Sequence, residues 1–167
     1  MTDRLYLETK FAVSDAGEIE GKAWDFTSPD RVGDMIDPKA LENLNLPLPM
    51  LFGHDQNDPI GSWTEATIAN GGLLLKGKLL VEDVARAREV RALVQSGAVR
   101  GLSIGFITRK ATPRKGGRTI YSLELMEASL VTVPCHPAAR VTSAKSAVRA
   151  LAIAGALNRA TALFSKR

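Results

Sequence analysis

The sequence is poor in the residues that most often build disulfide, metal and cofactor sites. It has a single cysteine, Cys135, and two histidines, His54 and His136. One cysteine cannot form an intramolecular disulfide or a cysteine-based zinc cluster, and two histidines without an H-E-x-x-H motif argue against metal catalysis. A glycine-rich phosphate loop is also missing. We therefore expect no cofactor and no metal, and the lone thiol fits a reducing compartment.

Long hydrophobic runs and aromatic residues are scarce as well. No stretch approaches the roughly 18 consecutive apolar residues that a membrane span requires, and the first residues lack the apolar segment of a signal peptide. The sequence thus predicts a soluble protein of the cytoplasm. Aromatic residues make up 5% of the chain, so its core has to be built mostly from Leu, Val, Ile and Ala.

Acidic residues are absent from one part of the chain, residues 143–167. Of the 22 basic and 18 acidic residues, five basic ones and no acidic one lie in this stretch. The net charge of +4 is therefore a property of this tail, and it indicates no nucleic-acid-binding face on the rest of the chain. We predict one domain over residues 1–142, followed by a basic, Ala-rich helical tail over 143–167.

The predicted secondary structure is rich in strands, with one or two helices. Asn70-Gly71-Gly72 marks a hairpin turn. A helix is expected over 82–96, a short one from Pro38 to about Asn43, and a loop over 25–37. Strands or extended segments are expected over 4–13, 19–26, 46–52, 60–68, 73–80, 103–110, 119–123 and 127–133. This order predicts an α+β, mostly β domain of barrel-like form.

Three short segments carry the candidate chemistry. They are Leu51-Phe-Gly-His-Asp55, Gly101-Leu-Ser-Ile-Gly-Phe106 and Leu125-Met-Glu-Ala-Ser-Leu-Val-Thr-Val-Pro134. Together they provide one histidine, one glycine-flanked serine and one carboxylate among apolar residues typical of strands. These are the parts of a hydrolase in which an imidazole, oriented by a third group, activates a serine hydroxyl.

Each candidate also has a purely structural interpretation. Ser103 fits as a small residue at the start of a strand, His54 as a turn residue, and Glu127 as an edge-strand or solvent-facing residue. A carboxylate among the apolar neighbours of Glu127 would be costly to bury without a partner. His136 is the alternative third member of the site. Asp55 is an alternative acid, but as the direct neighbour of His54 it would point elsewhere in an extended backbone.

The segment Gly101-Leu-Ser-Ile-Gly105 also matches the G-x-S-x-G pattern of the α/β-hydrolase nucleophile elbow. Three observations exclude that fold. The residues after the serine, Ile104-Gly-Phe-Ile-Thr108, are typical of a strand and not of the required helix. The better histidine precedes the serine, whereas the α/β-hydrolase order is Ser, acid, His. The regular alternation of strands and helices is missing.

At these and other segments the chain resembles the tailed-phage prohead proteases of the HK97 type, which process scaffold and capsid proteins. The resemblance covers about residues 5–141 and is specific because the segments occur in the order and spacing of that family. The matching segments are Ile19–Trp24, Gly33–Asp34 with Asp37–Leu41, Leu51–Asp55, Pro59–Trp63, Gly72–Leu73 with Lys76–Lys78, Gly97–Ala98, Gly101–Phe106, and Leu125–Pro134 with Ala139.

The resemblance implies both a fold and a set of site residues. The family is similar to the herpesvirus assemblins, which implies an antiparallel β-barrel of the herpesvirus-protease type with flanking helices. It further implies His54 as general base, Ser103 as nucleophile and Glu127 as the orienting acid. The chain departs from the family at Lys39, where Ala or Gly is common, and at Cys135-His136, where a small residue and Asn are more usual. The second departure keeps His136 as an alternative to Glu127.

The implied function is that of a serine endopeptidase that cleaves phage scaffold protein, major capsid protein or both during procapsid maturation. Those proteins are the implied partners, and a homodimer is one form that assembly-dependent activation would take. Neither a membrane nor a nucleic acid is expected as a partner. The implied location is the cytoplasm of the bacterial host, inside the assembling prohead. The alternative function is that of a non-catalytic capsid-assembly or scaffolding module that retains the protease fold.

Overall fold

Strands dominate residues 13–142, the part of the chain that this computed structural model describes. The elements are β1 (Glu18–Asp25), β2 (Asp34–Ile36), the 3₁₀ helix η1 (Pro38–Leu41), β3 (Leu48–Phe52), β4 (Pro59–Ala69), β5 (Gly72–Leu79), α1 (Ala85–Gln95), β6 (Gly101–Arg114), β7 (Gly117–Val131) and β8 (Arg140–Thr142). The helix predicted for the tail 143–167, and all but the last residue of the strand predicted over 4–13, lie outside the described residues. The domain boundary at 142 therefore stays a prediction.

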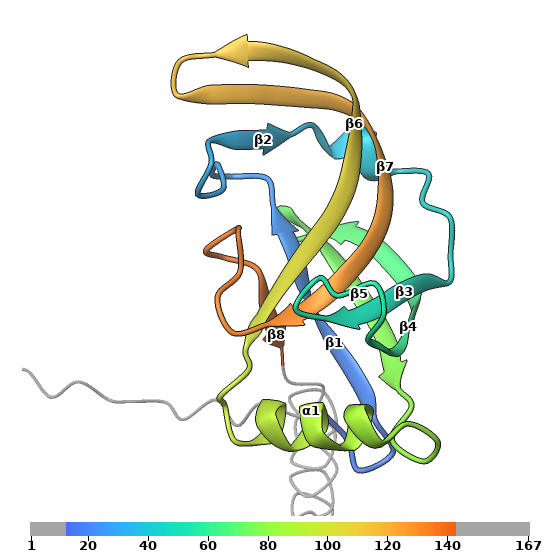
Figure 1. Ribbon diagram of the computed structural model, residues 1–167. Coiled ribbons are helices and arrows are strands. Elements are labelled where there is room, and N and C mark those ends of the chain that lie inside the picture. Colours follow the sequence, from blue (N-terminus) through green and yellow to red (C-terminus); the bar gives the residue numbers. More distant parts are fainter. Residues whose placement is uncertain (1–12, 143–167) are drawn as a thin grey trace, which may run out of the picture.

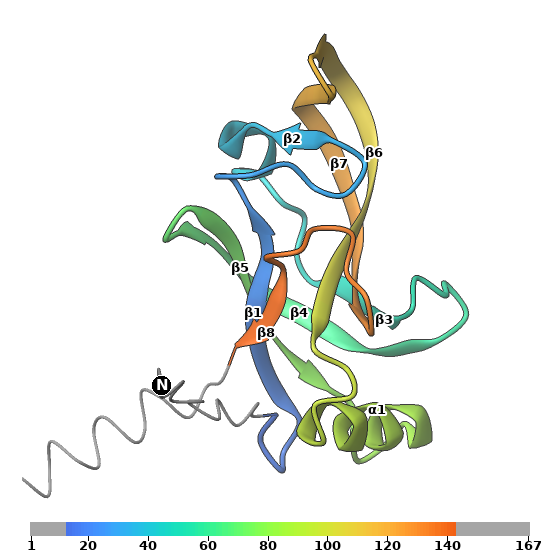
Figure 2. The same ribbon diagram turned by 90° about the vertical axis from the view of Figure 1, so that its left-hand side faces the viewer.

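Seven strands close a barrel in the order β7-β3-β4-β5-β1-β8-β6, because β6 pairs again with β7. Most neighbouring strands are antiparallel, but β3 runs parallel to β7. The short β2 lies outside the ring and pairs in parallel with residues 118–120 of β7. Figures 1 and 2 show the β6–β7 hairpin extending beyond one end of the barrel, with β2 beside it and α1 at the other end. The predicted α+β, mostly β barrel is confirmed.

Local sequence signals account for the turn and the helices. Asn70 and Gly71 have left-handed φ angles of 51° and 69°, as a two-residue turn between β4 and β5 requires. Helix α1 lies within the predicted range 82–96 and is followed by Gly97 at φ 79°. The predicted short helix is the 3₁₀ turn η1, in which the Asp37 side chain accepts a hydrogen bond from the Lys39 N–H at 2.9 Å.

Two predictions of secondary structure are wrong. Residues 25–37, expected to form a loop, contain β2, whose three residues are ordered by parallel pairing with β7. The two strands expected over 119–123 and 127–133 are one strand, β7, of 15 residues. β7 stays paired with β6 throughout, because three register shifts absorb the irregularities that interrupt the sequence pattern.

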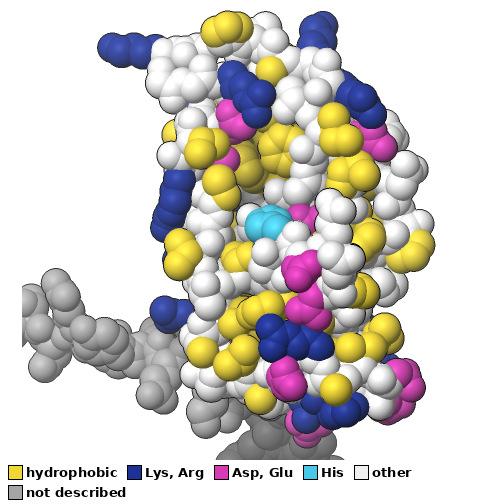
Figure 3. Space-filling model, in the orientation of Figure 1, with side chains coloured by type: hydrophobic (Ala, Val, Ile, Leu, Met, Phe, Trp, Pro, Cys, Tyr) yellow, Lys and Arg dark blue, Asp and Glu magenta, His cyan; other side chains and the backbone are white. Residues whose placement is uncertain are grey.

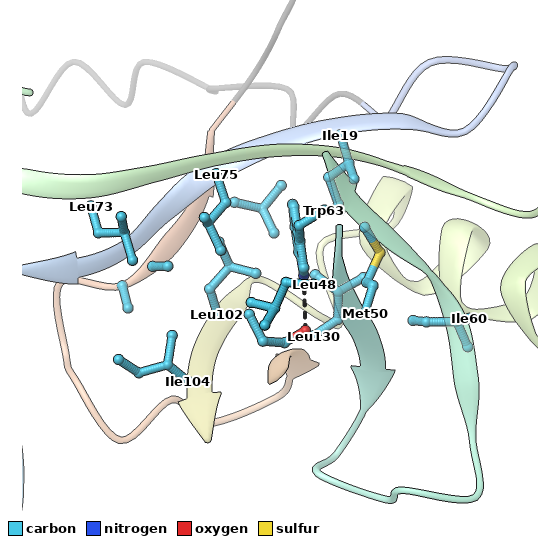
Figure 4. Packing of buried hydrophobic residues seen from close by; sticks show 14 of the residues in the cluster. Ile19, Leu48, Met50, Ile60, Trp63, Leu73, Leu75, Leu102, Ile104 and Leu130 are labelled. Carbon is cyan, nitrogen blue, oxygen red and sulfur yellow. Dashed lines mark hydrogen bonds between the residues drawn. The ribbon is translucent and has the colours of Figure 1, made fainter. Parts of the chain in front are cut away.

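The barrel is filled by aliphatic side chains packed around Trp63 (Figure 4). The buried indole N–H of Trp63 donates a hydrogen bond to the Ala128 carbonyl at 2.9 Å and so joins β4 to β7. The residues of β6 and β7 that pack into this core include Leu102, Ile104, Ala128 and Leu130. Because side chains alternate along a strand, the residues between them, Ser103, Glu127 and Ser129, project from the outer face.

Candidate active site

Ser103 and Glu127 lie on neighbouring strands of the barrel wall. In the antiparallel register of β6 and β7, Ser103 is opposite Ser129 and Gly105 is opposite Glu127. Residues directly opposite each other project from the same face of a sheet. Ser103 is 4% and Glu127 8% exposed, and at this level β7 has β6 on one side and β3 on the other. The edge-strand and solvent-facing interpretations of Glu127 are therefore wrong.

His54 reaches the same surface from the turn that follows β3. Gly53 and His54 both adopt left-handed backbone conformations, with φ angles of 64° and 65°. That conformation is uncommon for a residue other than glycine, and it persists where the surroundings hold it in place. Here the Gly53 N–H donates to the Leu130 carbonyl at 3.0 Å, and the His54 N–H donates to Ser129 Oγ at 3.0 Å. The turn is thus fastened to β7 at two points.

The imidazole of His54 is hydrogen-bonded to the carboxylate of Glu127, with Nδ1 and Oε1 2.7 Å apart. This hydrogen bond raises the pKa of His54 above 6.5; partial burial opposes the increase, and the carboxylate charge adds to it. Because Nδ1 carries the proton shared with Glu127, Nε2 is the ring nitrogen left for exchanging a proton with a nucleophile. A histidine with an acidic side chain next to it is visible on the face in Figure 3.

Ser129 is a part of the site that the sequence analysis missed. Its hydroxyl donates to Glu127 Oε2 at 2.6 Å and accepts the hydrogen bond from the His54 N–H. Ser129 is fully buried, so its contact with Glu127 is shielded from water, and its contact with the His54 N–H is partly shielded. A signal for it was present in the sequence, because a residue two positions after Glu127 in a strand projects from the same face.

Close packing, and not a nucleophile elbow, explains the glycines on either side of Ser103. A Cβ atom at Gly105 would lie 2.2 Å from Oε1 of Glu127. A Cβ atom at Gly101 would lie 2.7 Å from Cδ of Pro134 and 2.9 Å from the side chain of Val131. Gly101 thus allows β6 to approach the end of β7, and Gly105 leaves the space that the Glu127 carboxylate occupies.

Neither alternative to Glu127 lies against the His54 ring. Asp55 is exposed and its carboxylate accepts the Asn57 N–H at 2.8 Å, as in an Asx turn. His136 is 1% exposed; its Nε2 donates to the Ser28 carbonyl at 3.0 Å, and its Nδ1 accepts the Ala138 N–H at 3.2 Å. Both ring nitrogens of His136 are therefore occupied by the backbone of nearby loops.

Residues 13–142 hold neither a candidate metal cluster nor a helix that could span a membrane. No group of three or more His, Cys, Asp or Glu side chains in this part of the chain is arranged to hold a metal ion. None of the helices described there has the length and apolar character needed to cross a membrane.

Two solved structures share the fold of the barrel. The bacteriophage T4 capsid assembly protease superimposes with a TM-score of 0.56 at 14% sequence identity, over 69% of this chain and 81% of that protein. The KSHV protease, solved in complex with a hexapeptide phosphonate inhibitor, superimposes with a TM-score of 0.52 at 16% identity, over 75% of this chain and 64% of that protein. The barrel is therefore of the herpesvirus-protease type, as predicted.

Sequence comparison identifies phage relatives. The chain is 36% identical over 154 residues to a capsid polyprotein of Pseudomonas phage PAJU2, which covers 87% of the chain and 23% of the polyprotein. It is 32% identical to the prohead protease of Enterobacteria phage HK97 over 78% of the chain, and 30% identical to that of Escherichia phage T5 over 71%. The chain spans 61% and 59% of the lengths of these two proteases.

The match to a protein family covers most of the chain. Residues 6–152 match the family described as Caudovirus prohead serine protease, and the match extends past the predicted domain boundary at 142. The chain belongs to the caudovirus prohead serine protease family.

Proposed function

We propose that this chain is a serine endopeptidase that cleaves scaffold protein, major capsid protein or both during procapsid maturation. Ser103 is the nucleophile, His54 the general base and Glu127 the acid that orients His54. The enzyme acts inside the assembling prohead in the cytoplasm of the bacterial host. Assembly activates it, and formation of a homodimer is one form of that activation.

The observation that carries this proposal is the 2.7 Å contact between His54 Nδ1 and Glu127 Oε1, on the face from which Ser103 projects. A carboxylate on Nδ1 fixes the tautomer in which Nε2 accepts a proton, as a serine hydrolase requires. Membership of a peptidase family and the names of the phage relatives, a capsid polyprotein and two prohead proteases, support the choice of substrates.

The reaction would proceed through an acyl-enzyme. His54 Nε2 takes the proton of the Ser103 hydroxyl as Oγ attacks the scissile carbonyl carbon, and Glu127 stabilises the imidazolium that forms. His54 then gives the proton to the amine that leaves, and the acyl group remains as an ester on Ser103. A water molecule, deprotonated by His54, hydrolyses the ester and regenerates the serine.

Co-expression with the capsid and scaffold proteins of the phage tests the proposal. Wild-type protein and the Ser103→Ala variant are each co-expressed with these partners, and the intact masses of all chains are measured. We expect cleavage products with the wild type and their loss, by several orders of magnitude in rate, with Ser103→Ala. The matched control is Ser122→Ala, at an exposed serine on β7, which should cleave like the wild type.

The same samples distinguish the protease from a non-catalytic assembly module. If shells assemble and every chain keeps its full mass in the wild type, Ser103→Ala and His54→Ala alike, the chemistry is absent. The alternative, a capsid-assembly or scaffolding module with the protease fold, would then replace the proposal. Equal cleavage by wild type and Ser103→Ala would instead assign the cut to a different enzyme.

A further inference from the structure

A cavity of about 160 Å³ opens beside Ser103. It lies along β6. In the described chain, β6 pairs with β8 only at Gly101–Arg140. The edge of β6 beyond this pair is therefore free to form one wall of the cavity. Residues of the loop 26–33, between β1 and β2, and of the loop 132–139, between β7 and β8, form further walls. Because Ser103 itself lines the cavity, a side chain next to a peptide bond held at Ser103 is within reach of it.

The two loops that border the cavity are fastened to each other. The Arg31 N–H donates to the Cys135 carbonyl at 3.1 Å, and the Cys135 thiol donates to Asp30 Oδ2 at 3.3 Å. His136 adds the hydrogen bond to Ser28, and its ring packs edge-on against Trp24 with 4.7 Å between ring centroids. The cavity is therefore formed before a ligand arrives, as is usual for substrate pockets.

The lining combines an apolar surface with negative charge. Its apolar side chains are Ala23, Trp24, Val32, Ile104 and Phe106. Asp30 and Asp34 also line it, and Arg118 neutralises the Asp34 carboxylate through contacts of 2.8 and 2.9 Å. The Asp30 carboxylate accepts hydrogen bonds from the N–H groups of Val32 and Asp34 and from the Cys135 thiol. All three donors are uncharged. Among residues 13–142, the Asp30 carboxylate thus has no directly bonded cation, although the charge of Arg118 acts on it at longer range. Its negative charge disfavours a second carboxylate in the cavity.

We propose that this cavity is the pocket for one of the two side chains that flank the scissile bond, and that it accepts uncharged apolar side chains and rejects Asp and Glu. The inference rests on the proposed function, because it assigns a substrate to the same site. Asp30 repels acidic side chains, and the apolar wall binds aliphatic ones.

Cleavage of a peptide pool tests the chemistry of the pocket. The full chain, co-assembled with the capsid and scaffold proteins so that it is active, is incubated with an equimolar mixture of peptides of varied sequence, and mass spectrometry identifies the bonds cut. At one of the two flanking positions we expect aliphatic residues to be enriched and Asp and Glu depleted at least tenfold. Asp30→Asn keeps the oxygen that accepts both N–H groups but removes the charge, and it should reduce that depletion severalfold. Asp83→Asn, at an exposed position, should not.

Chemical modification of Cys135 separates the pocket from the catalytic step. Methyl methanethiosulfonate transfers its methylthio group to the Cys135 thiolate, forming a disulfide and releasing methanesulfinate. Because burial and the bond to Asp30 raise the pKa of this thiol, the reaction is run at alkaline pH. Modified enzyme should lose cleavage of the peptide pool at least tenfold, while Ser103 still reacts with a small fluorophosphonate. Cys135→Ser enzyme has no thiol at this position, so its rate of cleavage should be the same before and after the treatment, whatever that rate is.

The outcomes distinguish the two proposals. Cleavage next to acidic residues as often as next to aliphatic ones would overturn the pocket while leaving the protease. A preference unchanged by Asp30→Asn, or cleavage undiminished after Cys135 modification, would overturn it as well. If the unmodified enzyme neither cuts peptides nor co-expressed capsid proteins and Ser103 does not react with the fluorophosphonate, the proposed function itself fails.

Discussion

A single carboxylate connects the residues of the candidate site. One oxygen of Glu127 contacts the His54 ring and the other accepts the Ser129 hydroxyl, at 2.7 and 2.6 Å. The absence of a side chain at Gly105 leaves the space that this carboxylate occupies. Since both oxygens have fixed partners, the carboxylate has a defined orientation, and the orientation of the imidazole follows from it.

The pH dependence of cleavage should depend on Glu127. Only neutral His54 can act as a base, so kcat/KM should rise with pH through the pKa of His54, which Glu127 holds above 6.5. In Glu127→Gln the main cause of that increase is removed, and the acidic limb should move to lower pH. The plateau rate should fall by roughly 10²–10⁴-fold, because the tautomer is no longer fixed by a carboxylate. A series of kcat/KM measurements between pH 5 and 9 checks both effects.

Glu124→Gln is the matched control for this experiment. Glu124 lies on the same strand, is exposed, and pairs with Arg109. Its removal should leave both the acidic limb and the plateau unchanged. An acidic limb at the same pH in Glu127→Gln and wild type would contradict the assigned partnership between His54 and Glu127.

Ser129→Ala should impair both stability and cleavage. The change leaves the His54 N–H and one oxygen of Glu127 without their partner at a fully buried position, and such a loss costs about 1–3 kcal/mol. Because the orientation of Glu127 is loosened, we expect kcat to fall about tenfold or more while KM changes little. Urea denaturation and peptide cleavage measure the two effects, with Ser122→Ala as control. Reduced stability with an unchanged kcat would limit Ser129 to a structural role.

At the scale of elements, the β6–β7 ladder determines which residues meet. Its register places Ser103 opposite Ser129 and Gly105 opposite Glu127, and a register shift follows directly between Gly105 and Phe106. Such an irregularity increases the local twist of the strands and often accompanies functional sites. The hairpin thus supplies two of the three proposed triad members from adjacent positions, and the turn after β3 supplies the third.

Gly105→Ala should affect cleavage more than folding. The new Cβ would lie 2.2 Å from Glu127 Oε1, and the end of a side chain moves more easily than the paired backbone of β6. The carboxylate should therefore shift away from His54, with a loss of rate similar to that of Glu127→Gln. A double-mutant cycle with Glu127→Ala checks this cause, because Gly105→Ala should cost little once the carboxylate is gone. Additive losses of rate would exclude the steric explanation.

The elements that the sequence predicted are those with a local signal. Alternation, a glycine turn and helical spacing located β4, β5, their hairpin and α1 correctly. β2 and β8 were missed because each has three residues, too few to show alternation, and forms only by pairing with distant strands. The three candidate catalytic residues came from short motifs, and geometry brings His54 and Glu127 into contact. Alternation along the strand places Ser129 on the face of Glu127, but its contact with the His54 N–H depends on a left-handed turn. The role of Gly105 depends on the register between β6 and β7. No local pattern reveals the turn or the register.

At the scale of the whole molecule, an ion pair within β1 lies at the end of that strand, beside the β4–β5 hairpin. Asp25, the last residue of β1, lies opposite Gly72 in the register with β5. Its buried carboxylate contacts Lys22 Nζ at 2.8 Å and accepts the N–H of Thr27 at 2.9 Å. These contacts, with Lys22 first among them, hold the pKa of Asp25 well below its usual range.

Asp25 should contribute to stability in a pH-dependent manner. Because its pKa is lower in the folded than in the unfolded chain, its contribution is present above the unfolded value of about 4 and is lost as the pH falls towards the folded value. Asp25→Asn should lower the free energy of unfolding by about 1 kcal/mol at pH 7. It should also make the further loss between pH 5 and 3 smaller than in the wild type. Urea denaturation across this pH range measures both effects, with Asp83→Asn as control. Equal free energies of unfolding for the two variants at every pH would show that Asp25 makes no such contribution.

The fastening of the Gly53–His54 turn to β7 has a consequence for when the site becomes ordered. Its two backbone N–H groups are bound to Leu130 and Ser129, on a central strand of a closed barrel. The turn that carries the imidazole therefore loses its conformational entropy when the barrel folds. Binding of a peptide then requires no further ordering of this turn. Hydrogen exchange would measure this directly. The amides of Gly53 and His54 should exchange as slowly as those of the barrel wall, and more slowly than those of the surface turns.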